Sequence, residues 1–530
     1  MTKPKNILFV MCDQLRWDYL SCYGHPTLHT PNIDWLAENG VRFEYAYCQA
    51  PVCGPSRACT YTGRYMSSQG ATWNFDPWPI GEKMMGQYLR PLGLRTVVIG
   101  KTDHRPDTPS MALYGIDPDS DLGKRIAHRD FDPYDLDNGV HPDPLNKPGL
   151  KYNEYLNEQG YPGDNPWNDY THAVVDDDGQ IRDGWISSNA KYPSRLPEEH
   201  SETAYVTQRA IQFMDEQGDD PWCLHLGYIK PHWPYVASAP YHNMYSAEDI
   251  IPANRTEAER EAPHPIIGAY QQLRLSRVWA KEKARETIIP TYMGMIKQID
   301  DHFGRLLDYM RETGLIENTL IVFTSDHGDN LGDHWAGEKD LPYDCASRVP
   351  LIIYDPSPNA DATRGRVETR FAELIDLLPT FVEMAEGEIE QHRIEGRSLL
   401  PLLHGEANIP WRDYVISELD FTGRDVWRNL EIPYQEARGY MIRNEQWKYV
   451  LYENFPPQLF DMINDPQEQN DLGQSLEHET IRRDLHEELF RWLRARKRRV
   501  TVTAEEVYWN YGSAFEDRVG ALIGYWEDEG

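Results

Sequence analysis

The stretch Cys53-Gly54-Pro55-Ser56-Arg57, followed by Thr62-Gly63-Arg64, decides how the rest of this chain is interpreted. The pattern predicts a helix with a thiol at its start and Arg57 one helical turn later. The guanidinium is then close enough to orient and neutralise an anion that forms beside the thiol. A Cys-x-Pro-x-Arg motif alone is more often a structural cysteine beside a proline turn, so the other segments must decide its meaning.

Size and charge limit the partners of this protein. A chain of 530 residues can bury a large core, and we expect one large domain and a smaller one. The 53 Lys and Arg residues against 85 Asp and Glu residues give a net charge of -32, which would repel nucleic acid and anionic membrane surfaces. A site for a small anion must therefore concentrate local cations or a metal.

The N-terminal segment MTKPKNILFVMCDQ holds an apolar run that is too short for a secretory signal. No run of about 18 or more apolar residues is present, so we expect no membrane anchor. The seven cysteines lack zinc-type Cys-x-x-Cys spacing and predict reduced thiols. Four of them lie in the stretch from Cys22 to Cys59, so a local disulfide within this group is an alternative. These features predict a cytoplasmic protein.

Apolar, β-branched runs alternate with helical patterns through roughly the first 390 residues. This alternation is typical of an α/β fold in which helices sandwich a large mixed, mostly parallel sheet. The predicted strands are Asn6–Cys12, Leu94–Ile99, Trp222–Tyr228, Leu320–Thr324 and Val349–Tyr354.

Four of these strands end in polar residues: Asp13-Gln14, Gly100-Lys101, Lys230-Pro231-His232 and Ser325-Asp326-His327. Ligands of open α/β sheets bind outside the carboxyl ends of the strands, so these groups should converge on one crevice. Two carboxylates, an amide oxygen and an imidazole suit a divalent cation bound mainly through oxygen. The prolines around His232 would fix its backbone and hold its ring near a leaving group.

The predicted organisation has three parts. Residues 1–405 form the catalytic domain, in which 102–196 is a long, irregular active-site insertion rich in Asp, Pro, Asn and Gly. Residues 406–500 form a smaller α+β subdomain. Its predicted elements are strands Tyr414–Glu418, Gly439–Arg443 and Trp447–Tyr452 and a helix through Arg499 with the apolar stripe Ile481, Leu485, Leu489 and Trp492. The aromatic tail 501–530 is expected to pack on a neighbouring subunit of a homodimer or homotetramer.

Together these segments resemble the type I, formylglycine-dependent sulfatases and the related phosphonate monoester hydrolases of the alkaline phosphatase superfamily. The signature is the stretch around Cys53. Further segments look like family segments in family order: Arg348-Val349-Pro350-Leu351, Asp376-Leu377-Leu378-Pro379-Thr380, Gly396-Arg397-Ser398-Leu399, Lys448-Tyr449, Leu459-Phe460-Asp461 and Asn464-Asp465-Pro466. The resemblance implies an alkaline-phosphatase-like fold.

The resemblance also implies the roles of the site residues. Formylglycine-generating machinery would oxidise Cys53 to formylglycine, the nucleophile. One divalent cation, Ca²⁺ or Mn²⁺ ahead of Mg²⁺ or Zn²⁺, would be held by Asp13, Gln14, Cys53, Asp326 and His327. The implied catalytic and substrate-binding groups are Arg57, Asn74, Lys101, His232 and Lys339. Of these, the resemblance places Lys101 on the nucleophile and Lys339 on a non-bridging oxygen of the transferred group, and His232 donates to the leaving oxygen. The family tends to show Gly-Lys-x-His after the Lys101 strand, whereas here Asp103 takes that place and His104 follows, so either residue is a candidate base.

The activity implied by the resemblance is metal-dependent hydrolysis of sulfate monoesters through a covalent sulfo-enzyme intermediate, with promiscuity toward phosphonate monoesters and phosphodiesters. The alternative is a phosphonate monoester hydrolase or phosphodiesterase. Gln14 stands where many sulfatases have a second Asp, which lowers the negative charge of the site. A catalytically inactive scaffold and a redox or zinc-binding role for the Cys22–Cys59 cluster are alternatives from other classes.

Overall fold

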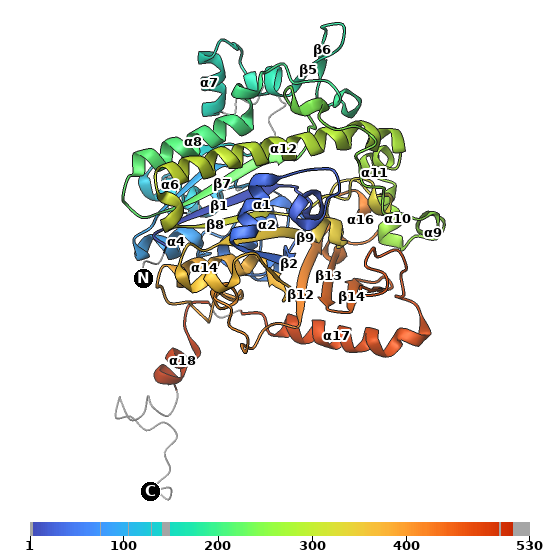
Figure 1. The fold of residues 1–530 in the computed structure, drawn as a ribbon. Coiled ribbons are helices and arrows are strands. Elements are labelled where there is room, and N and C mark those ends of the chain that lie inside the picture. The colour runs from blue at the N-terminus through green and yellow to red at the C-terminus, as the bar shows by residue number, and fades with distance from the viewer. Residues whose placement is uncertain are drawn as a thin grey trace, which may run out of the picture.

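The computed structural model describes residues 4–74, 76–103, 105–128, 130–139, 149–497 and 500–511. Its main sheet has the strand order β10-β2-β9-β8-β1-β7-β3-β4, and β11 pairs with β2. Figure 1 labels β2, β9, β8, β1 and β7 of this sheet. Only β9 runs antiparallel to its neighbours, β2 and β8. The strands are β1 Asn6–Asp13, β2 Val41–Tyr47, β3 Arg95–Gly100, β4 Asp132–Leu136, β7 Trp222–Pro231, β8 Thr319–Ser325, β9 Arg348–Tyr354, β10 Arg366–Glu368 and β11 Ala372–Glu373.

Helices cover both faces of this sheet, because the central strands are apolar on both sides. In β1, Leu8 and Val10 belong to one core and Ile7 and Phe9 to the other. The first core includes residues of α1 (Pro31–Asn39), α8 (Glu202–Gln217) and α12 (Glu282–Glu312), and the second includes residues of α2 (Cys53–Thr62), α4 (Met85–Leu89) and α14 (Leu377–Met384). The predicted mixed, mostly parallel sheet between helices is confirmed.

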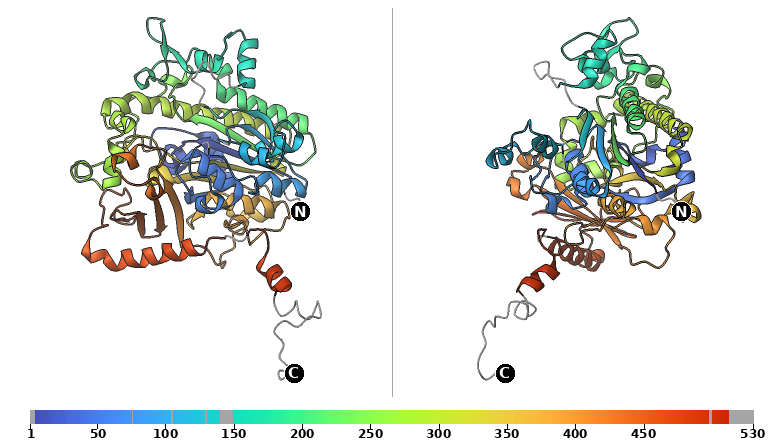
Figure 2. Two further views of the ribbon diagram at one scale, coloured as in Figure 1. Left: turned by 180° about the vertical axis from the view of Figure 1, so that it is seen from behind. Right: turned by 90° about the vertical axis from the view of Figure 1, so that its left-hand side faces the viewer.

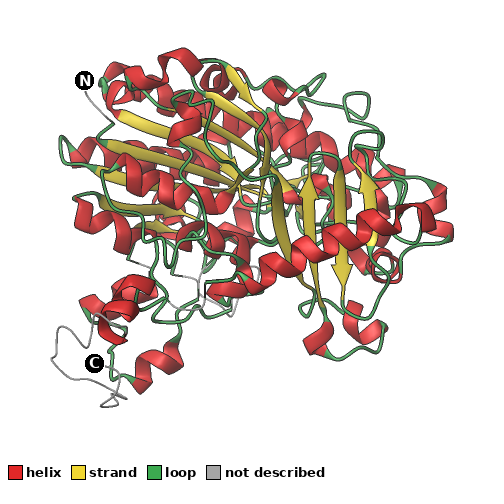
Figure 3. Ribbon diagram, turned by 90° about the horizontal axis from the view of Figure 1, so that it is seen from below, coloured by secondary structure: helices red, strands yellow, loops and turns green. Residues whose placement is uncertain are grey.

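A second, antiparallel sheet lies beside the first (Figure 3). Its strands are β12 Tyr414–Asp420, β13 Arg438–Asn444, β14 Trp447–Tyr452 and β15 Gln458–Asp461. Helix α17 (Glu479–Arg494) crosses one face and buries Leu485, Leu489 and Trp492, with Ile481 partly buried, so the predicted apolar stripe is confirmed. The opposite face packs against Leu341 and Tyr343, in a loop that follows β8.

Two expectations about local structure were wrong. The segment 102–196 is not irregular, because it contains α5 (Thr108–Leu113), α6 (Asp121–Ala127), β4, α7 (Lys151–Glu158) and the hairpin β5 (Ala173–Val175) and β6 (Ile181–Asp183). Strand β4 escaped prediction because it is short and contains Pro133, which an edge strand tolerates. Helix α17 ends at Arg494, not Arg499, because Arg496 and Lys497 turn toward Glu395.

The seven cysteines are free, as predicted. No helix in the described part of the chain is long and apolar enough to cross a membrane. Helix α18 (Ala504–Tyr511) points away from the body of the molecule (Figure 2). Residues 512–530, with most of the aromatic tail, lie outside the described residues, so the subunit contact stays a prediction.

Asp300 on α12 connects two helices of the first core. Its fully buried carboxylate accepts hydrogen bonds from the backbone amides of Asn32 and Ile33, at 2.9 Å each, in the first turn of α1. These amides have no partner within their own helix. We expect Asp300→Ala to lower the free energy of unfolding by about 1–3 kcal/mol, because two amides lose their acceptor.

Urea unfolding followed by circular dichroism measures this effect. The matched control is Asp308→Ala on the same helix, where the carboxylate is 71% exposed and pairs with Arg311. The control should shift the transition by less than about 0.5 kcal/mol. Equal shifts in the two variants would contradict a capping role for Asp300.

Candidate active site

Neighbouring parallel strands bring the predicted groups to one edge of the main sheet. Asp13 ends β1, Lys101 follows β3, His232 follows β7, and Asp326 and His327 follow β8. Because β8, β1, β7 and β3 are adjacent and parallel, their carboxyl ends meet. The convergence predicted from the sequence is confirmed.

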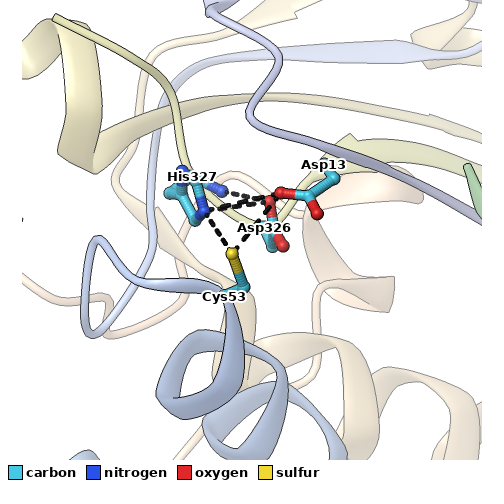
Figure 4. A group of neighbouring side chains, drawn as sticks. All are labelled: Asp13, Cys53, Asp326 and His327. Atoms are coloured by element: carbon cyan, nitrogen blue, oxygen red, sulfur yellow. Dashed lines mark hydrogen bonds and ion pairs between the residues drawn. The ribbon is translucent and has the colours of Figure 1, made fainter. Parts of the chain in front are cut away.

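Cys53 faces the residues at these strand ends from the first turn of α2 (Figure 4). Its sulfur lies 3.1 Å from Nε2 of His327 and 3.5 Å from Oδ1 of Asp13. His327 Nε2 is in turn 3.6 Å from a carboxylate oxygen of both Asp13 and Asp326. All four side chains are buried, and one potential ligand atom of each lies within 4.8 Å of the others. We call these four residues the ligand group.

The local sequence favours a short helix that begins at Cys53 and ends before Gly63. Pro55 is tolerated because amides in the first helical turn have no intrahelical acceptor. Gly63 ends the helix at φ 64°, a left-handed conformation that suits glycine. Ser56 Oγ donates to the backbone carbonyl of Asp326 at 2.6 Å and so ties the helix to the end of β8. The helix N-terminus also favours negative charge beside residue 53.

The ligand group fits a divalent cation. His327 Nδ1 donates to the carbonyl of Gly328 at 2.7 Å, which leaves Nε2 as the ring acceptor that faces the group. Burial lowers the pKa of His327, which favours the neutral ring that binds metals. Two carboxylates, an imidazole and the side chain of residue 53 are a donor set for a metal of intermediate hardness.

Gln14 borders the ligand group in a left-handed backbone conformation with φ 66°. Its backbone amide donates to Asp326 Oδ1 at 3.1 Å, and its Oε1 accepts from Lys339 Nζ at 2.9 Å. Its side-chain amide donates to Asp329. Non-glycine residues with positive φ occur where their surroundings hold them, often at functional sites.

Three cations surround the group. Lys101 forms an ion pair with Asp13, and Arg57 Nε pairs with Asp326 Oδ2 at 2.9 Å. Lys339 Nζ donates to the Cys53 sulfur at 3.1 Å. The structure therefore places Lys339 on the nucleophile candidate, the contact that the family resemblance assigns to Lys101. Arg57 is tied to Asp326, and its Nη1 also donates to the carbonyl of Lys101 at 2.9 Å.

The charges in this site alter the acidities of the buried groups. Burial is the largest single influence on Asp13 and opposes its ionisation, but Lys101, His232, Lys339 and Arg57 together outweigh burial and hold the pKa of Asp13 well below its usual range. Burial also raises the pKa of the Cys53 thiol, with Asp13 acting in the same direction. An unmodified Cys53 is therefore a poor nucleophile at neutral pH.

The remaining predicted residues border this site. His232 is buried and its Nδ1 donates to the carbonyl of Trp233 at 2.6 Å, which leaves Nε2 for another partner. Asn74 Oδ1 accepts from the backbone amide of Gly54 at 2.7 Å, beside Cys53. Asp103 is buried, and its Oδ2 has no hydrogen-bond partner among the described residues. His104 lies outside the described residues.

Sequence reasoning missed supporting residues around Gln14. Asp329 accepts from the Gln14 amide and from the Tyr235 hydroxyl, the latter at 3.0 Å. Burial raises the pKa of Asp329 to about 6, although the Gln14 amide acts against this. The Tyr292 hydroxyl donates to the Gln14 carbonyl at 2.8 Å. Asp329 could have been found from the sequence, because it lies three residues after the metal-ligand candidate Asp326. Tyr292 lies far from the other site residues in the sequence, so no pattern pointed to it.

Two family models match this chain. The model described as Sulfatase matches residues 5–387, and the model described as N-sulphoglucosamine sulphohydrolase, C-terminal, matches residues 332–495. The second match spans the loop that carries Lys339 and the whole second sheet. Both sheets therefore have counterparts in family models.

Individual proteins are similar over nearly the whole chain. The multifunctional alkaline phosphatase superfamily protein PehA of Trinickia caryophylli is 33% identical over 515 residues, which cover 92% of this chain and 95% of PehA. An arylsulfatase of Clostridium perfringens is 27% identical over 504 residues, with 90% and 91% covered. The structure of the phosphonate monoester hydrolase SpPMH from Silicibacter pomeroyi superposes with a TM-score of 0.82 at 27% identity, with 94% and 98% covered. Because the Sulfatase model matches more than half of the residues, this chain belongs to the sulfatase family.

Proposed function

We propose that this protein hydrolyses sulfate monoesters as its preferred substrates through a formylglycine formed from Cys53, and that it also accepts phosphonate monoesters, which carry one negative charge as well. The single observation that carries the proposal is the position of Cys53 at the N-terminus of α2, with its sulfur facing the ligand group and in contact with Lys339. Family membership supports an ester hydrolase. The modification and the preferred ester are the proposed part.

The proposed reaction uses residue 53 twice. Formylglycine-generating machinery removes two electrons from Cβ of Cys53 with an oxidant that the machinery supplies, and the sulfur leaves as sulfide. Water adds to the resulting aldehyde and gives a carbon with two hydroxyl groups. One hydroxyl gives its proton to a base, for which Asp103 and His104 are the candidates, and attacks the sulfur or phosphorus. The bond to the ester oxygen breaks, and this oxygen leaves with a proton from His232, which produces the covalent intermediate. The second hydroxyl then loses its proton and re-forms the aldehyde, which expels sulfate or phosphonate. Water restores the hydrate.

Side chains of this chain would orient the ester and move the protons. Nδ1 of His232 is occupied by a backbone carbonyl, so Nε2 is the atom that would give a proton to the leaving oxygen. Burial lowers the pKa of His232, so the ring must first take up a proton at Nε2, and the protonated ring is then a strong acid toward the leaving oxygen. Lys339 would stabilise negative charge on the transferred group, and Asn74 would contact it beside Gly54.

The divalent cation would be held by Asp13, Asp326, His327 and residue 53, with Gln14 at the border of the group. When bound, it would lower the pKa of a hydroxyl on residue 53 and polarise an ester oxygen. Lys101 and Arg57 balance the negative charge of Asp13 and Asp326 through direct ion pairs. The chain therefore supplies both the ligands and the countercharges.

A second candidate is that phosphonate monoesters are the preferred substrates. It is supported by the superposition with SpPMH, which covers 94% of this chain. Gln14 carries a neutral amide in place of a second carboxylate. Its repulsion of an ester oxygen is therefore weak, and it is the same for a sulfate monoester as for a phosphonate monoester. The charge of the site therefore favours singly charged esters, but it does not distinguish sulfate from phosphonate monoesters.

The first prediction concerns residue 53. We expect Cys53→Ala to lower kcat/KM by at least about 10³-fold while the protein remains folded, because the nucleophile is removed. The matched control is Cys59→Ala on the same helix, also buried, which should retain activity. Mass spectrometry of the peptide that contains residue 53 should detect the aldehyde. Fully active protein with only unmodified cysteine at this position would refute the proposal.

The second prediction concerns the metal. Asp326→Asn should remove most of the bound divalent cation and most of the activity, because a charged ligand is lost. Elemental analysis of the purified variant measures the metal independently of turnover. Asp355→Asn is the control, since Asp355 is a buried carboxylate that follows β9, whose antiparallel direction places it at the opposite edge of the sheet. Normal metal content in the Asp326 variant would show that the ligand group is misassigned.

The third prediction concerns substrate charge. On one preparation, nitrophenyl sulfate and the nitrophenyl ester of phenylphosphonate should both be hydrolysed with higher kcat/KM than nitrophenyl phosphate. The phosphate monoester carries one more negative charge, which the three cations must balance in addition to Asp13 and Asp326. The ratio of kcat/KM for the sulfate ester to kcat/KM for the phosphonate ester decides which of these two substrate classes is preferred. A clear preference for the phosphate monoester would indicate a phosphatase instead.

A further inference from the structure

Lys339 sits in a strained loop. The residues on both sides of it, Glu338 and Asp340, have left-handed backbone conformations with φ 64° and 81°. Such conformations persist in residues other than glycine only where the surrounding structure holds them. Lys339 itself is buried, and its Nζ contacts Gln14 and Cys53 at 2.9 and 3.1 Å. The conformation of this loop therefore determines where the ammonium group lies.

Arg424 binds both sides of this loop from the second sheet. It lies between β12 and α16 (Val426–Asn429). Its Nε donates to the carboxylate of Asp340, and its Nη2 donates to Glu338 Oε2 at 3.1 Å. One planar guanidinium thus bridges the two carboxylates that flank Lys339, a geometry that a lysine ammonium cannot reproduce with the same fixed fork.

The same segment packs against the residue that precedes Asn74. The guanidinium of Arg424 lies 5.5 Å from the centroid of the Trp73 ring. A Cβ atom on Gly423 would approach that indole to 2.0 Å, so only glycine fits there. Asp340 also donates its backbone amide to the carbonyl of Pro51 at 3.1 Å, two residues before Cys53. Gly423 and Arg424 of the second sheet therefore contact Trp73, the neighbour of Asn74, and Arg424 also binds the loop that carries Lys339.

We infer that Arg424 is a positioning residue for Lys339: by bridging Glu338 and Asp340 it holds the ammonium group against Gln14 and residue 53. The inference rests on the proposed function, since it assigns the position of a group that acts on the ester. Arg424 does not itself contact Cys53 or the ligand group in the described structure. Its effect on turnover is therefore indirect; we assign it to Lys339, and an effect through Trp73 and Asn74 would instead add to the loss in a Lys339→Ala background.

A double-mutant cycle tests this inference on the full-length, metal-loaded protein. We expect Arg424→Ala to lower kcat by about 10–100-fold, with a smaller change in KM, because Lys339 is misplaced. In a Lys339→Ala background, Arg424→Ala should add less than about twofold. Arg424→Lys, which retains a cation able to hold one carboxylate, should recover part of the lost activity. Arg428→Ala, an exposed arginine of the same connection, should stay within about twofold of the unaltered protein.

The possible results separate the two proposals. If the unaltered protein hydrolyses none of the three nitrophenyl esters, the proposed function fails. If it is active but the losses from Arg424→Ala and Lys339→Ala multiply, the positioning role is overturned. Full activity of Arg424→Ala overturns it as well. Should Arg424→Ala not fold, the same cycle with Arg424→Lys decides by the same criterion.

Discussion

The burial of unlike charges is the constraint on which this site depends. Asp13 and Asp326 are inaccessible to solvent in one group, and an unpaired carboxylate in such a place would be strongly destabilising. Lys101 balances Asp13 from the end of β3, and Arg57 balances Asp326 from α2. The two ion pairs therefore fix how β1, β3, β8 and α2 meet. The arrangement that satisfies these charges also collects metal ligands beside residue 53.

Local electrostatics differ from those of the whole protein. The chain carries a net charge of -32, yet Arg57, Lys101 and Lys339 are concentrated at one edge of the main sheet together with the N-terminus of α2. A small anion in this place meets cations at short range, where their effect is greatest because water is excluded. This concentration explains how an acidic protein can belong to a family whose substrates are anionic esters.

The second sheet takes part in building the site. One face of it packs against Leu341 and Tyr343, which follow Lys339, and Lys448 on β14 binds the carboxylate of Asp344 at 2.6 Å. The loop that carries Lys339 is thus supported by the second sheet, although its contacts with Gln14 and Cys53 belong to the first. A family model that spans residues 332–495 joins this loop and the second sheet in one unit. Changes in the second sheet can therefore reach the candidate site.

The sequence by itself determined the sheet type, the convergence of polar strand ends, the start of the helix at Cys53 and the apolar stripe of α17, because each of these follows from a local pattern of residues. It did not reveal the edge strand β4, which is too short for a periodic pattern and contains a proline. Only the tertiary structure decided which cation pairs with which carboxylate. It also decided that Arg424 bridges Glu338 and Asp340, the two neighbours of Lys339. Such partners lie up to hundreds of residues apart, so they meet only when strand order and the packing of the two sheets bring them together.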